Sequence, residues 1–171
     1  MRGLRTATIT LAAAALTAAV AASSVTAARG DTVRGGGVEI LLPDGWERIQ
    51  PAPQGVVDDP RTVLVVGTEG VRSIETECQV SSYRVPADGA VVVVIGWREP
   101  TGVSAFLPLS AMKLRRGMFQ CFDDRGAVAQ VTRRGLDYQV NVMVGDRASA
   151  ETIDAALDAA RSIIAAPRRH D

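Results

Sequence analysis

Residues 136–164 read LDYQVNVMVGDRASAETIDAALDAARSII, a stretch that predicts a strand followed by a helix. Apolar residues alternate with others over Leu136–Val144, which is typical of a strand with one face in the core and the other mostly in water. The residues predicted on the wet face are Asp137, Gln139, Asn141 and Met143. Ser149 is the expected N-cap of the helix, and Pro167 ends it. The apolar stripe of that helix consists of Ile153, Leu157, Ala160 and Ile164.

More strands are predicted on the N-terminal side of this stretch. The run Val91–Ile95 is continuous and β-branched, which predicts a strand buried on both faces at the centre of a sheet. Two tight turns, at 123–126 and 133–135, join two shorter strands to the one at 136–144 and predict an antiparallel meander. Strands followed by a terminal helix indicate an α+β fold, with an antiparallel β-sheet and the C-terminal helix packed on one face.

The N-terminal part of the domain contains a further predicted hairpin. Pro43-Asp44-Gly45 is a turn sequence, because proline fixes φ and glycine accepts a positive φ. It predicts that the strands at 38–42 and 46–49 pair with each other. The predicted organisation is a flexible lead-in at 29–36, a single α+β domain at 37–166 and a disordered tail at 167–171.

Residues 1–28 have the three parts of a secretory signal peptide. Arg2 and Arg5 form a positive n-region, Ile9–Ala22 is apolar, and small residues then offer cleavage after Ala27 or Ala28. The alternative is an uncleaved membrane anchor, since the apolar part approaches the roughly 20 residues that a bilayer requires. The weak hydrophobicity of alanine favours cleavage. The expected location is therefore secreted or on the exterior of the cell envelope, with membrane contact only if the segment is retained.

The two cysteines of the chain, Cys78 and Cys121, are consistent with export. In an oxidising compartment they are expected to form one structural disulfide. The chain-entropy treatment of such a loop gives about 4 kcal/mol of stabilisation. A redox pair is the alternative, but such pairs normally have the Cys-x-x-Cys spacing, which is absent.

Several segments of the mature chain resemble segments of other proteins. They are Cys78-Gln79-Val80, Tyr83-Arg84-Val85-Pro86, residues 138–146 and the closing helix. In these segments the chain resembles small exported actinobacterial proteins of unknown function, a likeness that spans most of the mature chain and implies no activity. The segment from Val38 to Trp46, with the strand-then-helix ending, also resembles the PsbP-like α+β fold.

Charge and residue types exclude several classes of function. The chain has 19 basic and 19 acidic residues, and loss of the signal segment leaves it slightly acidic, so no nucleic-acid partner is expected. The only histidine is His170 in the predicted tail, where a catalytic base or a zinc ligand cannot be held in position. No catalytic residues, no metal and no cofactor are therefore assigned.

The candidate binding residues are few. Trp46 and Trp97 are either exposed platforms for a ligand or caps of the core, and Gln139 and Asn141 form a contact surface on the predicted wet face. The arginine pairs 115–116 and 133–134 are either an anion patch or a solvated surface.

These features favour a secreted, non-catalytic module that binds a protein or a component of the envelope. One alternative is a carboxylate-based enzyme, for example acting on glycans, in which Glu75 and Glu77 flank the bond. The other is a membrane-tethered domain that retains its N-terminal segment.

Overall fold

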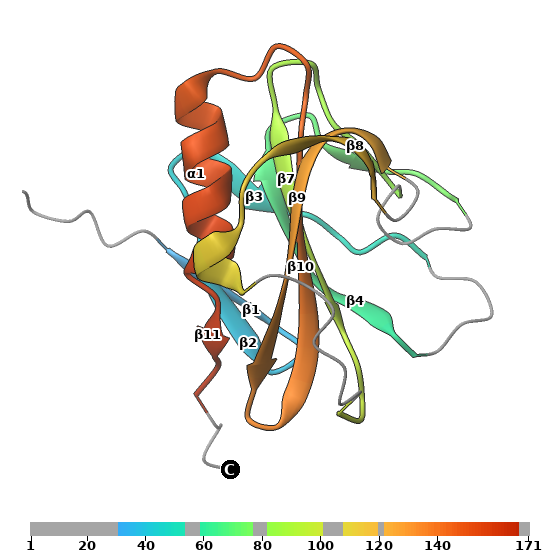
Figure 1. The fold of residues 1–171 in the computed structure, drawn as a ribbon, viewed down its shortest axis with the longest axis vertical. Coiled ribbons are helices and arrows are strands. Elements are labelled where there is room, and N and C mark those ends of the chain that lie inside the picture. Colours follow the sequence, from blue (N-terminus) through green and yellow to red (C-terminus); the bar gives the residue numbers. More distant parts are fainter. Residues whose placement is uncertain (1–30, 54–58, 77–81, 101–107, 120–121, 168–171) are drawn as a thin grey trace, which may run out of the picture.

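The computed structural model describes residues 31–53, 59–76, 82–100, 108–119 and 122–167. The signal segment, Cys78, Cys121, Glu77 and His170 lie outside the described residues. In chain order the elements are β1 (Thr32–Gly35), β2 (Val38–Leu41), β3 (Trp46–Arg48), β4 (Arg61–Thr68), β5 (Arg72–Ser73), β6 (Tyr83–Arg84), β7 (Ala90–Gly96), the 3-10 turn η1 (Leu109–Ala111), β8 (Arg115–Phe119), β9 (Phe122–Arg133), β10 (Leu136–Val144), α1 (Ala150–Arg161) and β11 (Ile164–Ala165) (Figure 1).

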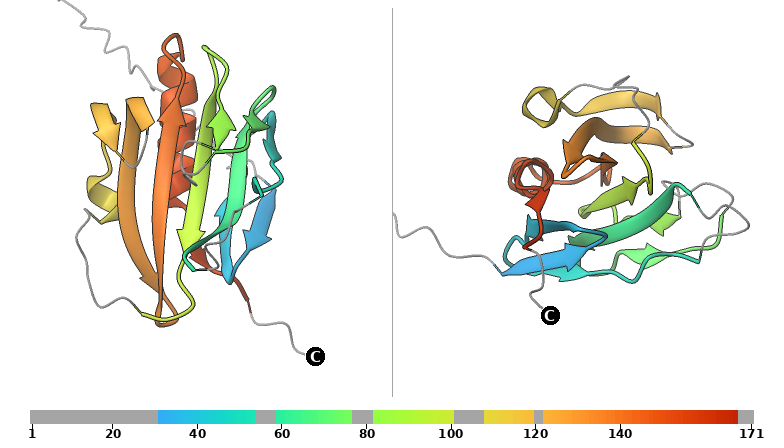
Figure 2. Two further views of the ribbon diagram at one scale, coloured as in Figure 1. Left: turned by 90° about the vertical axis from the view of Figure 1, so that its right-hand side faces the viewer. Right: turned by 90° about the horizontal axis from the view of Figure 1, so that it is seen from below.

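Antiparallel sheet dominates the described part of the chain. A six-stranded sheet has the order β3-β4-β7-β10-β9-β8, and Figure 2 shows its strong twist. A small sheet has the order β1-β2-β11, and β5 pairs with β6. With one helix, at its C-terminal end, the described chain has the predicted α+β class. No helix of the described residues is long and apolar enough to span a membrane.

Strand β7 lies in the interior of the six-stranded sheet, between β4 and β10. All of its residues from Ala90 to Gly96 are buried, which confirms the prediction from the run of β-branched residues. Val92 and Val94 belong to one hydrophobic cluster, here the first cluster, and Val91 and Val93 to another, here the second cluster. The two faces of the sheet therefore each border a separate core.

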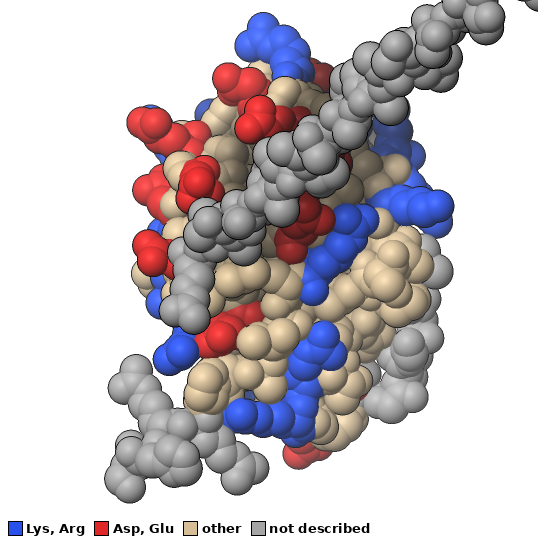
Figure 3. All heavy atoms as spheres, turned by 90° about the vertical axis from the view of Figure 1, so that its left-hand side faces the viewer, with Lys and Arg blue, Asp and Glu red and all other residues tan. Residues whose placement is uncertain are grey.

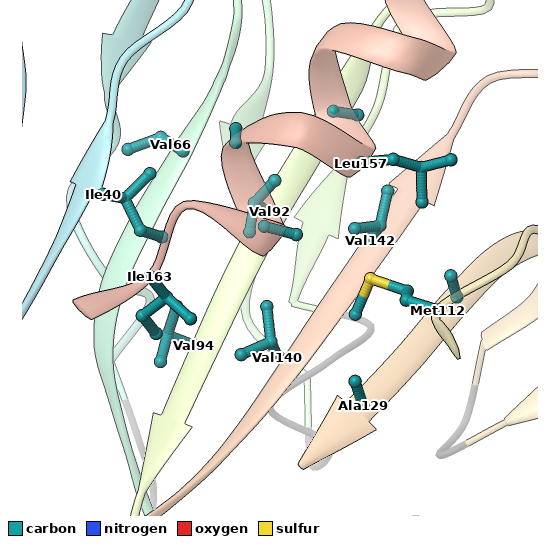
Figure 4. Close-up of a cluster of buried hydrophobic side chains, with 14 of the residues drawn as sticks. Ile40, Val66, Val92, Val94, Met112, Ala129, Val140, Val142, Leu157 and Ile163 are labelled. Atoms are coloured by element: carbon teal, nitrogen blue, oxygen red, sulfur yellow. The ribbon is translucent and has the colours of Figure 1, made fainter. Parts of the chain in front are cut away.

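Helix α1 contributes its buried side chains to the first cluster. Ser149 is its N-cap, as predicted, because the Ser149 hydroxyl accepts a hydrogen bond from the Thr152 backbone N–H at 3.1 Å. Figure 4 shows Leu157 beside Val142 of β10, and Val92 of β7 belongs to the same cluster. The buried residues of the helix are Ala156, Leu157, Ala159 and Ala160.

The predicted apolar stripe fails at its last member. The helix ends at Arg161, and Ile164 lies in β11 with 52% of its surface exposed. Ile163 is fully buried in its place. The reason is that helical periodicity stops once the chain leaves the helix, so a four-residue spacing no longer identifies the inward side.

Three predictions about the strands are wrong. Thr32–Gly35, expected in the flexible lead-in, forms β1 and pairs with β2. The pair β2 and β3 is not a hairpin, since β2 pairs with β1 and β11 while β3 pairs with β4. The predicted turn at 123–126 lies within β9. The first two errors share a cause: Gly36 and Gly37 have φ values of 56° and 87°, which makes the glycine run the turn of a β1–β2 hairpin.

Candidate functional site

Gln139 and Asn141 do not form a contact surface. They are 1% and 0% exposed, so the predicted wet face of β10 is a buried one. The Gln139 Nε2 amide donates to Asn141 Oδ1 at 2.8 Å, and Asn141 Nδ2 donates to the Val93 carbonyl at 3.4 Å. Strand β10 lies between β7 and β9 and is covered on both sides, so alternation of polar and apolar residues does not indicate exposure there.

Trp46 and Trp97 are half-buried and lie apart. Trp46 packs against the first cluster and Trp97 against the second. Trp46 is paired with Thr68 at one end of β4, whereas Trp97 follows β7 at the Arg61 end of that strand. Each ring thus covers core, and the structure does not bring the two together. Glu75 is exposed, and its predicted partner Glu77 lies outside the described residues.

A row of three register partners crosses the sheet at the Arg61 end of β4. Arg61 is opposite Gly96 on β7, and Gly96 is opposite Tyr138 on β10. A Cβ atom on Gly96 would lie 3.1 Å from both Cδ1 and Cε1 of the Tyr138 ring. The missing side chain therefore leaves room for the tyrosine ring over the backbone of β7.

The turn of the β1–β2 hairpin meets this row. The Tyr138 hydroxyl donates a hydrogen bond of 2.7 Å to the Gly36 carbonyl, and Gly36 lies against the side chain of Val63. These contacts leave a pocket of about 250 Å³, here the Tyr138 pocket. Its lining residues are Gly36, Arg61, Val63, Gly96, Trp97, Arg98, Leu136 and Tyr138.

The charged side chains that line the Tyr138 pocket are arginines. Arg61 and Arg98 line it and are exposed, so they lie at its mouth, while Tyr138 is buried. Burial raises the pKa of the Tyr138 hydroxyl, and the positive charge of Arg134 partly offsets this. The hydroxyl is therefore neutral at physiological pH. The Asp59 carboxylate is also nearby, where its Oδ1 accepts a hydrogen bond from the Arg98 backbone N–H at 3.1 Å.

A second hollow of about 270 Å³, here the Leu41 groove, lies between the β2–β3 connection and α1. Leu41, which lines it, is 51% exposed. Its polar side chains are Asp44 and Asp158, and Asp158 is already paired with Arg161 at 3.2 Å. The groove therefore offers apolar surface but little that would select a ligand.

Other functional chemistry is sparse in the described part of the chain. It contains no group of three or more histidine, cysteine, aspartate or glutamate residues that could hold a metal ion. The side of the molecule shown in Figure 3 carries both acidic and basic residues, and neither sign covers it. The Tyr138 pocket combines apolar walls with the positively charged side chains of Arg61 and Arg98, whereas the charged side chains of the Leu41 groove are acidic.

Sequence reasoning did not identify Arg61 or Arg98. They belong to segments that look unrelated in the sequence, and only the register of β4 against β7 places them at one pocket. The one sequence signal was Gly96, a glycine directly after a β-branched run, where a close approach to the backbone is expected.

Comparison with known proteins found no match to this chain: no protein-family model, no curated protein and no solved structure. No relative therefore bears on its function, and the geometry of the pocket carries the proposal.

Proposed function

We propose that this chain is an exported, non-catalytic binding module whose ligand occupies the Tyr138 pocket. The observation that supports this is the combination of apolar walls, from Val63, Leu136 and the Tyr138 ring, with arginines at the mouth. Ligand sites typically have this composition, with a few polar groups that orient the ligand. At about 250 Å³ the pocket is smaller than a typical drug-sized site, so it suits a small molecule or one group of a larger envelope component.

The proposal includes a fixed scaffold for the pocket, in which α1 packs on one face of the six-stranded sheet. Side chains of α1, β2 and the sheet share the first cluster, which supports this arrangement. Arg133, at the end of β9, also joins the sheet to the segment after the helix, since its Nε and Nη2 groups donate hydrogen bonds to the Ile163 carbonyl at 3.2 and 3.0 Å. Because β11 pairs with β2, the helix, the small sheet and the hairpin turn at Gly36 are held together. A rigid pocket binds without the cost of ordering loops.

The residues of the pocket favour binding over catalysis. Arginine does not release its proton in proteins, so Arg61 and Arg98 do not act as general bases. The Tyr138 hydroxyl donates to the Gly36 carbonyl, and its raised pKa opposes ionisation. The carboxylate-based alternative requires Glu75 and Glu77 to converge, and no observation favours it.

A fragment titration followed by NMR tests this function. Uniformly ¹⁵N-labelled protein, in the form that its host exports, is titrated with a library of small organic molecules. We expect binding fragments to shift the backbone amide signals of Gly36, Gly96 and Leu136, while the Gly45 amide, beside the Leu41 groove, reports on binding at that competing site. Fragments that shift only signals of the Leu41 groove, or a library with no binders at millimolar concentration, would contradict the proposal.

Export has a separate test. The intact mass of the protein recovered from its native host is measured without reductant. We expect a chain that starts at Ala28 or Arg29 and is about two daltons lighter than its reduced form, as one disulfide between Cys78 and Cys121 requires. A full-length mass found only in membranes would instead support the tethered alternative, and an unchanged mass on reduction would exclude the disulfide.

A further inference from the structure

The charge at the mouth of the Tyr138 pocket selects the kind of ligand. Arg61 is exposed and has no ion-pair partner among the described residues. Arg98 lines the same pocket, and Arg134 is close enough to influence Tyr138. Asp59 is the acidic residue that the described contacts place beside them. The unpaired guanidinium group of Arg61 therefore favours an anion over a cation or a neutral molecule.

The interior of the pocket selects the shape of that anion. Val63 and Leu136 are partly buried and pack against the first cluster, and Tyr138 presents its ring. A bare inorganic anion would leave these apolar surfaces in contact with water, whereas a compact apolar group would cover them. The volume of about 250 Å³ accommodates one ring or one branched aliphatic group.

We propose that the Tyr138 pocket binds a small organic carboxylate, with its apolar body against Val63, Leu136 and the Tyr138 ring and its carboxylate toward Arg61. This rests on the proposed function and names the class of ligand for the same site. The planar guanidinium group matches a carboxylate through two parallel hydrogen bonds. One unpaired guanidinium balances the single charge of a carboxylate, whereas a phosphate monoester carries about −1.5 to −2 at neutral pH.

The test compares benzoate, benzyl alcohol and inorganic phosphate by NMR titration of the exported protein. Benzoate is expected to bind with a Kd of about 1 mM, as befits a ligand of this size. Benzyl alcohol has the same ring without the charge, and phosphate has charge without the ring. Each is expected to bind about tenfold more weakly than benzoate. Phosphate binding as tight as that of benzoate would overturn the requirement for an apolar body.

Two variants separate the ligand class from the function. Arg61→Gln removes the exposed charge and is expected to weaken benzoate about tenfold while leaving benzyl alcohol unchanged. Arg48→Gln, which changes an exposed arginine on β3 in the same way, should leave both affinities unchanged. Arg98→Gln serves as a second variant if Arg61→Gln does not fold, with a weaker affinity for benzoate alone expected again.

The experiments distinguish a failure of the proposed ligand class from a failure of the proposed binding function. If benzyl alcohol binds the pocket as tightly as benzoate and Arg61→Gln has no effect, the carboxylate inference is wrong while the binding function stands. If none of the three probes nor any library fragment shifts the Gly36 and Gly96 signals, both are wrong.

Discussion

The Gln139→Glu variant is expected to lose about 3 kcal/mol or more of its free energy of unfolding at neutral pH. Gln139 is 1% exposed and its Nε2 group donates to Asn141 Oδ1. A glutamate carboxylate would occupy the same space, but it would place a negative charge in the core and set two acceptors against each other. Asn141 cannot simply reverse its amide, because its Nδ2 group donates to the Val93 carbonyl. Urea denaturation measures the loss.

Gln50→Glu is the matched control, because it makes the same change at an exposed position. It should alter the free energy of unfolding by less than about 0.5 kcal/mol. Burial raises the pKa of a carboxyl group, so the deficit of Gln139→Glu should shrink as the pH falls and the carboxylate is protonated. Equal stability of the two variants would mean that the face of β10 that carries Gln139 is open to water, as the sequence pattern alone predicts.

The Ala156→Glu variant is also expected to lower the free energy of unfolding by about 3 kcal/mol or more. Ala156 is fully buried and belongs to the first cluster, together with residues of β7 and β10. A longer, charged side chain there would have to push α1 away from the other residues of the first cluster or bury its carboxylate. Leu157, the next residue, belongs to the same cluster as Val142 of β10, and both are labelled in Figure 4. Thermal and urea denaturation both measure the effect.

Ala155→Glu is the control for helix propensity and charge, because it makes the same substitution one position earlier at a half-buried site. A change of less than about 1 kcal/mol is expected. If Ala156→Glu were no more destabilising than Ala155→Glu, α1 would not be packed on the sheet, and the fixed scaffold proposed for the pocket would be lost.

The fold class could be predicted from those local patterns that neighbouring residues determine. The β-branched run of β7 has few alternatives to a central strand, and Ser149 begins α1 through a hydrogen bond to a residue three positions away. Pairing of distant strands could not be predicted in this way. The glycines at 35–37 look like a flexible lead-in, yet Gly36 lies in a turn that contacts Val63 and accepts a hydrogen bond from Tyr138, two residues far away in the sequence.

The candidate site could not be predicted for a related reason. Gln139 and Asn141 look like surface residues because they alternate with apolar residues along the strand. They can nevertheless be buried, because hydrogen bonds within the protein satisfy their amide groups. Arg61 and Arg98 look like ordinary charged residues until the register of β4 with β7 brings them to one pocket. Burial of polar groups and the meeting of distant strands are both tertiary properties.

The most direct test of the Tyr138 pocket is a crystal structure of the exported protein grown with benzoate. The predicted result is a benzoate ring against Val63 and Leu136, with its carboxylate about 3 Å from the Arg61 guanidinium group. A pocket without ligand at saturating benzoate, or a carboxylate directed away from Arg61, would contradict the account.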